Sequence, residues 1–256
     1  MIIQAEILAA RERLRHAFFT REGGVSEGPF ASLNCGFSSG DEASLVAENS
    51  ARAVHRLGLS PDRLCTARQV HGTTVLVARE PSLGRPSLEA DALVTDRTDL
   101  ALGVLSADCA PVLLADPDAG VIGAAHAGWR GALAGIVEAT IDAMAGLGAE
   151  RTRIVAAIGP CIAQPSYEVG PEVLDKFTAA DAESTTHFLR VPGSDRLLFD
   201  LKAHVRRRLL QAGVASCLAL PQDTAADERH FFSHRRTRRS GGERFGLLLS
   251  AIALTS

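Results

Sequence analysis

Three side chains of this sequence could together hold a metal ion or carry out a nucleophilic reaction. Cys109 lies in the segment SADC, His126 lies in GAAHAGWRG, and His71 lies in RQVHG. Each follows an apolar, strand-like run at a change of chain direction, where side chains from different strands can converge. Glycines close to both histidines let a ligand approach the backbone. We therefore expect Cys109, His126 and His71 to meet in space.

These residue types are compatible with two chemistries. Two imidazoles and one thiolate match a catalytic zinc site, in which three protein ligands leave a fourth position for water, and the metal lowers the pKa of that water to near ~7. Asp108, which precedes Cys109, could orient the water or move its proton. Alternatively, Cys109 is a nucleophile and His126 or His71 is its base. Two histidines favour the metal, because a thiol dyad needs only one.

Arginine side chains suited to anion binding occur in three segments. Arg21 and Ser26 lie in the glycine-rich segment REGGVSEGPFASLN, Arg130 lies at the start of a predicted helix, and residues 234–239 form the basic run HRRTRR. Guanidinium groups bind phosphate oxygens through paired hydrogen bonds. A phosphate co-substrate is therefore expected near Arg21 or near the first residues of the basic run. The last arginines of the run are expected to lie in a solvated loop, because charge runs usually do.

Recognition of a nucleobase would need amides and aromatic stacking surfaces. Asn34 and Gln69 offer amides, and Phe37 and Phe232 offer rings. An amide can both donate to and accept from the edge of a purine. The predicted substrate contacts are Arg21, Ser26, Asn34, Gln69, Arg130, His234 and Arg235.

Short apolar runs predict the strands that position the candidate residues. Residues 64–77 predict two strand segments, or one strand broken by a bulge at Gly72, with His71 at the irregularity. A proline-containing loop is expected over residues 80–88. Between residues 89 and 116, three apolar runs are too short for helices and predict consecutive buried strands.

Helices are expected to follow or flank these strands. The spacing of apolar residues predicts helices over residues 41–57, 128–148 and 199–211. The second follows a predicted strand over residues 121–125 and a glycine bend. His126 would then lie just before a helix N-terminus, a position that attracts anions. The simplest account is a single α+β domain over residues 1–256.

Composition excludes several classes of protein. The chain has 256 residues, of which 46% are hydrophobic, so it can bury a sizeable core. Its net charge of −3 does not favour nucleic-acid binding. No apolar run approaches the ~20 residues of a membrane helix, and the N-terminus becomes charged too early for a signal peptide. The five cysteines form no CxxC pair, which suits reduced thiols and a cytoplasmic protein.

Seven motifs in the same order resemble one known family. The motifs are FFTREGGVSEGPFASLN, QVHG, EADALVT, SADCAPVLLAD, GAAHAGWRG, IGPCIAQPSYEVG and FFSHRR, and the match covers about residues 16 to 248. They closely resemble the multicopper polyphenol oxidase or laccase-domain proteins, understood as zinc-dependent enzymes. Members phosphorolyse adenosine, inosine, guanosine and methylthioadenosine, and deaminate adenosine. The resemblance implies His71, Cys109 and His126 as zinc ligands, with purine nucleosides and inorganic phosphate as substrates.

The resemblance also implies a fold and leaves two other activities open. The expected fold has mixed β-sheet layers flanked by helices, distantly similar to a bacterial toxin deamidase with a Cys-His site. A Cys-His thiol hydrolase or amidase, acting for instance on cell-wall precursors, is therefore the alternative. The older copper oxidase name is less favoured, because the chain has eight histidines and no HxH pair, although the same ligands could take copper.

Overall fold

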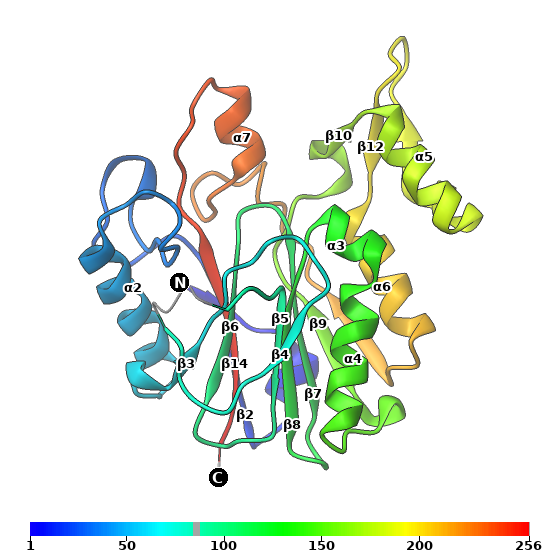
Figure 1. Ribbon diagram of the computed structural model, residues 1–256. Helices are drawn as coiled ribbons and strands as arrows, with labels where there is room; N and C mark the ends of the chain where they lie inside the picture. Colours follow the sequence, from blue (N-terminus) through cyan, green and yellow to red (C-terminus); the bar gives the residue numbers. More distant parts are fainter. Residues whose placement is uncertain (84–87, 256) are drawn as a thin grey trace.

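Two β-sheets packed face to face form the centre of the molecule, and helices cover the outer face of each (Figure 1). The computed structural model describes residues 1–83 and 88–255. Both sheets contain parallel and antiparallel pairs, so the predicted α+β class with mixed sheets is confirmed. Residues 84–87 of the loop expected over residues 80–88 lie outside the described residues.

The first sheet joins strands from both ends of the chain. Its order is β1 (Ile2–Ile3), β2 (Leu14–Phe19), β14 (Leu248–Leu254), β6 (Ala101–Ser106) and β3 (Leu64–Cys65). Strand β14 is antiparallel to both β2 and β6, whereas β3 is parallel to β6. The last strand of the chain therefore lies in the middle of this sheet.

The second sheet carries the residues with candidate chemistry. Its order is β13 (Ser216–Ala219), β9 (Val155–Ile158), β7 (Ala110–Asp116), β8 (Val121–Ala127), β5 (Ala92–Thr95) and β4 (Val75–Val77). Strands β7 and β8 form a hairpin in which Ala110 pairs with Ala127 and Asp116 pairs with Val121. This register places the residue before β7 beside the end of β8.

Apolar side chains between the two sheets form a shared core. Phe18, Leu102 and Ile252 of the first sheet pack with Leu113 and Ile122 of the second. The other face of the second sheet is also buried, against α4 (Ile136–Gly146) and α6 (Leu201–Gln211). A strand buried on both faces needs apolar residues at every position. That requirement explains why β7 is apolar from Ala110 to Ala115 and β8 from Val121 to Ala125.

The remaining elements cover the edges and the ends of the strands. Helix α2 (Ala43–Arg56) packs on the outer face of the first sheet through Ala53 and Val54. The other helices are α1 (Glu6–Ala9), α3 (Trp129–Ala134), α5 (Pro171–Ala180) and α7 (His234–Arg239). A small third sheet has the order β10 (Glu168–Val169), β12 (Leu197–Phe199) and β11 (Phe188–Arg190). Short 3-10 helices are η1 (Gly28–Phe30), η2 (Pro61–Arg63), η3 (Arg151–Arg153), η4 (Gln164–Ser166) and η5 (Ala182–His187).

Two local predictions are corrected by the structure, and one pair of alternatives is decided. The helix expected over residues 128–148 is two helices, α3 and α4, because Gly135 between them has a φ of +101°. Residues 64–77 contain two strand segments and not one bulged strand, since β3 joins the first sheet and β4 the second. The basic run expected as a loop forms α7, whose N-cap Ser233 accepts a hydrogen bond from the backbone N–H of Arg236.

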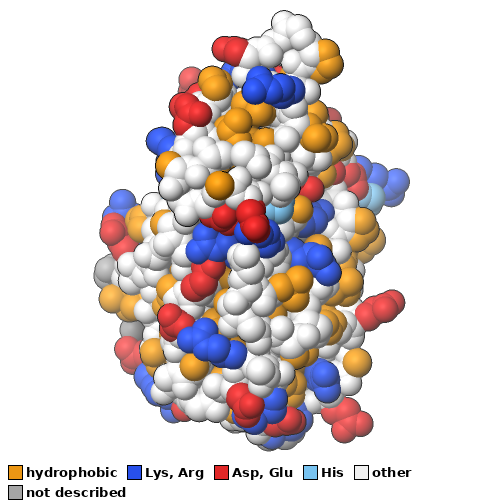
Figure 2. Space-filling model, turned by 90° about the vertical axis from the view of Figure 1, so that its right-hand side faces the viewer, with side chains coloured by type: hydrophobic (Ala, Val, Ile, Leu, Met, Phe, Trp, Pro, Cys, Tyr) orange, Lys and Arg blue, Asp and Glu red, His pale blue; other side chains and the backbone are white. Residues whose placement is uncertain are grey.

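One face of the molecule carries side chains of both charges. Figure 2 shows acidic and basic side chains interspersed over the face that α4 and α6 cover, without a continuous region of one sign. Among the described helices, none has both the length and the apolar character that crossing a bilayer requires.

A buried histidine in β2 makes stability depend on pH. His16 is 1% exposed, and its Nε2 accepts a hydrogen bond of 2.9 Å from the backbone N–H of Ala5. Burial lowers the pKa of His16 from its ordinary 6.5 to about 4. The unfolded chain therefore takes up this proton at a higher pH than the folded chain. The free energy of unfolding should decrease as the pH falls from 6.5 to 4, by up to ~1.4 kcal/mol per pH unit.

Urea unfolding at several pH values checks this prediction. His16→Gln removes the titrating group and keeps an acceptor for Ala5, so its stability should change less with pH in this window. His55→Gln, at an exposed position of α2, is the matched control and should follow the native protein. Equal pH dependence in all three proteins would contradict the assignment.

Candidate metal centre

The β7–β8 hairpin and the segment before β4 bring Cys109, His126 and His71 together. Cys109 directly precedes β7, and His126 pairs with Pro111 near the end of β8. One ligand atom from each of the three residues lies within 4.8 Å of the others, and Cys109 Sγ is 3.9 Å from His71 Nε2. The predicted convergence is confirmed. His126 is 3% exposed whereas His71 is exposed, so the cluster opens on the His71 side.

The carboxylate of Asp91 connects His126 to the backbone turn that carries His71. Asp91 directly precedes β5 and is fully buried. Its Oδ1 accepts a hydrogen bond of 2.9 Å from Nδ1 of His126, and its two oxygens accept the backbone N–H groups of Val70, His71 and Gly72 at 3.1, 2.9 and 2.7 Å. A carboxylate can only accept, so it fixes the proton on Nδ1 and leaves Nε2 of His126 for a metal.

The backbone conformation at His71 and the lack of a side chain at Gly128 allow the cluster to form. His71 has a φ of +62°, in the left-handed region, and the N–H groups donated to Asp91 hold this turn. A Cβ on Gly128 would lie 2.9 Å from Cδ2 of His71 and 3.0 Å from Sγ of Cys109. Glycine at position 128 therefore lets the histidine and the thiol approach the end of β8.

Electrostatics favours the thiolate form of the cysteine. Burial alone would raise the pKa of Cys109, but the attraction of His126 and hydrogen bonds from both imidazoles outweigh it, and the pKa is lowered. Burial alone would lower the pKa of His126, but the thiolate of Cys109 and the carboxylate of Asp91 raise it. The thiolate is the form that binds metals and attacks as a nucleophile.

Asp108 is tied to the segment that leads into α7. It has a φ of +91° and is 8% exposed. Its Oδ1 accepts a hydrogen bond of 2.7 Å from the hydroxyl of Thr224, and its Oδ2 accepts from the hydroxyl of Ser233 at 2.9 Å and from the backbone N–H of Arg235 at 2.6 Å. Asp108 thus anchors the start of α7 beside Cys109.

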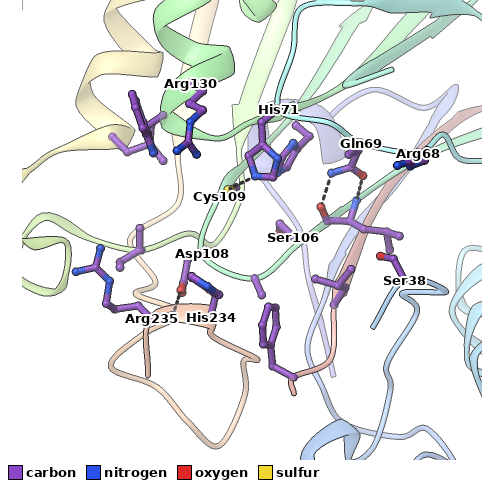
Figure 3. Close-up of a pocket in the computed structure, with 18 of the residues that line it drawn as sticks. Ser38, Arg68, Gln69, His71, Ser106, Asp108, Cys109, Arg130, His234 and Arg235 are labelled. Atoms are coloured by element: carbon purple, nitrogen blue, oxygen red, sulfur yellow. Dashed lines mark hydrogen bonds between the residues drawn. The ribbon is translucent and has the colours of Figure 1, made fainter. Parts of the chain in front are cut away.

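A cavity of about 870 Å³ lies over the cluster (Figure 3). This volume is in the range of pockets that take small organic ligands. Its lining includes the three candidate ligands, and five further residues predicted from the sequence, which are Gln69, Asp108, Arg130, His234 and Arg235. The lining residues that sequence reasoning missed include Ser38, Arg68, Trp129, Tyr167 and Phe245.

Three predicted substrate contacts do not line the cavity. Nε of Arg21 donates to the carbonyl of Ala31 at 2.7 Å, and its guanidinium lies 4.4 Å from the ring centroid of Phe232. Ser26 and Asn34 both donate to the carboxylate of Asp41, at 2.6 and 3.0 Å. The glycine-rich loop uses these polar groups for its own structure. Arg21, Ser26 and Asn34 were expected to contact substrate, but their polar groups stabilise the loop instead.

Gln69 lines the cavity but uses its amide elsewhere. Its Oε1 accepts a hydrogen bond from the N–H of Leu105 at 2.8 Å, and its Nε2 donates to the carbonyl of Leu105 at 2.7 Å. Figure 3 shows these two bonds running from Gln69 to the backbone rather than into the cavity. Of the two rings considered for stacking, Phe37 lines the cavity, whereas Phe232 is 2% exposed and belongs to the core.

Comparison with known proteins identifies the family. The model of the family described as multi-copper polyphenol oxidoreductase laccase matches residues 15–255. The chain belongs to this laccase family. Proteins named purine nucleoside phosphorylase are similar to it, one from Corynebacterium glutamicum at 43% identity (89% of this chain, 91% of that protein) and one from Deinococcus radiodurans at 40% (91% and 88%).

Solved structures of similar proteins have the same fold. YlmD from Geobacillus stearothermophilus has a TM-score of 0.89 at 31% identity, covering 98% of this chain and 94% of that one. NMB0706 from Neisseria meningitidis has a TM-score of 0.86 at 33% identity, covering 96% of both chains. The architecture of this laccase-family chain is therefore shared by proteins of modest sequence identity.

The donor set fits a single metal ion. Two imidazoles and a thiolate within 4.8 Å of one another suit tetrahedral coordination with one open position. Within residues 1–83 and 88–255, this is the one group of three or more His, Cys, Asp or Glu residues close enough to hold a metal.

Replacing Asp91 by asparagine should weaken metal binding. The amide of Asp91→Asn would place N–H groups against the backbone donors of Val70 or Gly72, and the turn at His71 would lose its anchor. We expect the affinity for zinc, measured by competition with a chelator, to decrease about 10–100-fold.

Asp116→Asn provides the matched control. Asp116 is also fully buried and accepts backbone N–H groups, including that of Glu150 at 2.8 Å, but it lies at the other end of the hairpin. This variant should lose stability and keep its zinc affinity within about twofold, because it lacks contact with the ligands. Equal loss of zinc in both variants would show that the effect of Asp91 is only one of general stability.

Proposed function

We propose that this chain is a zinc-dependent purine nucleoside phosphorylase. The observation that carries the proposal is the convergence of His71, Cys109 and His126 at the cavity of about 870 Å³. Relatives at 40–43% identity carry the name purine nucleoside phosphorylase. Adenosine, inosine, guanosine and methylthioadenosine are the proposed nucleosides, with inorganic phosphate as co-substrate.

Phosphorolysis exchanges one bond at the sugar for another. An oxygen of phosphate forms a bond to C1′ while the bond between C1′ and N9 of the purine breaks. The electron pair of the broken bond stays on the purine, which takes up a proton, and the 1-phosphate of the nucleoside's sugar is the other product. Zinc held by His71, Cys109 and His126 would supply a Lewis acid and positive charge at the cavity floor.

The chain's own residues have distinct proposed roles. Asp91 orients His126 through Nδ1, and Asp108 positions the start of α7 through the N–H of Arg235. Asp108 was expected from the sequence to act on a proton. Because both of its oxygens accept hydrogen bonds from the protein, a positioning role is now the better proposal. His234 and Arg235 line the cavity as proposed contacts of the substrates.

Deamination of adenosine is proposed as a second activity of the same site. In that reaction water replaces the amino group at C6 and ammonia leaves. Zinc deaminases of nucleobases use histidine and cysteine ligands of the same kinds. The support for this activity is the donor set of the cluster together with the family resemblance.

One observation favours a second candidate function. The thiolate of Cys109 interacts with the imidazole of His126, and the carboxylate of Asp91 orients that imidazole. This is the arrangement of a nucleophilic triad. A thiol hydrolase or amidase could use it without metal. His71 argues against this candidate, because a triad has no use for a second imidazole within 3.9 Å of the sulfur.

Incubation with adenosine, with and without phosphate, tests the proposal. Purified protein should contain about one zinc per chain and release adenine only when phosphate is present. Cys109→Ala should lower turnover by more than about a hundredfold, since loss of an outer partner alone costs about 10–100-fold. Cys217→Ala in β13, at a cysteine outside the cavity lining, is the control and should keep its activity.

Chelation and alkylation separate the two candidates. A metal enzyme should lose turnover when zinc is removed and regain it when zinc is restored. A thiol hydrolase would withstand the chelator and be inactivated by iodoacetamide. Full turnover of nucleoside in metal-free protein would contradict the proposed function.

A further inference from the structure

Two guanidinium groups, neither paired with a carboxylate of the described residues, line one side of the cavity. Arg130 is the second residue of α3, and Arg235 is the second residue of α7. Both line the cavity. In Figure 3 they lie on the same side of Cys109, whereas Gln69 and Arg68 lie on the opposite side. We call the side with Arg130 and Arg235 the arginine wall and the side with Gln69 and Arg68 the opposite wall.

Arg130 is oriented but not neutralised. Its guanidinium lies over the ring of Trp129, 4.4 Å from the centroid. Among the residues that the structure describes, none forms an ion pair or a hydrogen bond with this guanidinium. Stacking on an aromatic face restricts the side chain and leaves its N–H groups free for a ligand.

Three contacts hold Arg235, and none of them pairs its guanidinium with a carboxylate. Its backbone N–H donates to Asp108 at 2.6 Å, and its Nη1 donates to the carbonyl of Glu168 at 2.6 Å. The guanidinium lies 5.2 Å from the ring centroid of Tyr167. A carbonyl is a neutral acceptor, so the positive charge is not cancelled, and most of the five N–H donors of the side chain stay available.

No carboxylate among the described lining residues pairs with these two guanidinium groups, and the thiolate of Cys109 is paired with the two imidazoles. Arg68, on the opposite side, forms an ion pair of 2.9 Å with Glu89. Among the described lining residues the one carboxylate is that of Asp108, and it accepts three hydrogen bonds from the protein. A cavity with two uncompensated arginines in a chain of net charge −3 is suited to an anion.

We propose that Arg130 and Arg235 form the subsite for the phosphate co-substrate. This inference rests on the proposed phosphorolysis and assigns its anion to one wall of the cavity. Two guanidiniums on a dianion form charge-assisted and partly bidentate hydrogen bonds. The nucleoside then occupies the remaining part of the cavity, whose lining includes the apolar side chains of Phe37, Phe245 and Leu247. The two substrates meet over the metal cluster between the walls.

Steady-state kinetics of Arg130→Gln and Arg235→Gln tests the subsite. Each variant of the zinc-loaded enzyme should raise the KM for phosphate at least about tenfold, because a hydrogen bond to a charged group contributes that much to binding. The KM for the nucleoside should change less than about twofold. Arg239→Gln, at the exposed end of α7 and outside the cavity lining, should match the native enzyme in both constants.

Direct binding of inorganic phosphate separates this inference from the proposed function. Calorimetric titration should show binding to the native protein and to Arg239→Gln, and at least about tenfold weaker binding to the other two variants. That result supports the subsite even if no nucleoside is cleaved. Thermal unfolding of each variant shows whether it is folded. Unchanged phosphate binding in folded Arg130→Gln and Arg235→Gln, or no phosphate binding by the native protein, overturns the inference.

Discussion

The geometry of the candidate site depends on one buried carboxylate. Asp91 accepts a hydrogen bond from Nδ1 of His126 and three from the backbone around His71. These contacts join a strand of the second sheet to an irregular segment that is distant in sequence. A buried charge is stable only when it is fully hydrogen-bonded, and this requirement makes the turn at His71 and the orientation of His126 parts of one network.

The surrounding fold keeps this network rigid. Hairpin β7–β8 is buried on both faces, between the first sheet and the helices α4 and α6. Its register fixes Cys109 and His126 side by side. On the other side of Cys109, Asp108 holds the start of α7 and with it Arg235. Asp91 therefore positions the two histidines at the cavity, and Asp108 positions Arg235.

The sequence predicted the convergence of His71, Cys109 and His126 and the α+β class, because both depend on local patterns. Cys109 and His126 lie next to the ends of buried strands, and side chains at strand ends can converge. Asp91 was missed, because an aspartate before a strand is usually a turn residue and its partners are about 20 and 35 residues away. Arg21, Ser26 and Asn34 were expected to contact substrate, but their loop uses their polar groups internally. Whether a polar side chain faces a cavity or its own loop depends on tertiary packing, which spacing does not report.

X-ray absorption at the zinc edge of the purified protein tests the central claim most directly. The account predicts a first shell of one sulfur at about 2.3 Å and two imidazole nitrogens at about 2.0–2.1 Å, with one further light atom. Such a shell would identify Cys109, His71 and His126 as ligands of one ion. A zinc shell without sulfur, or bound copper in place of zinc, would contradict it.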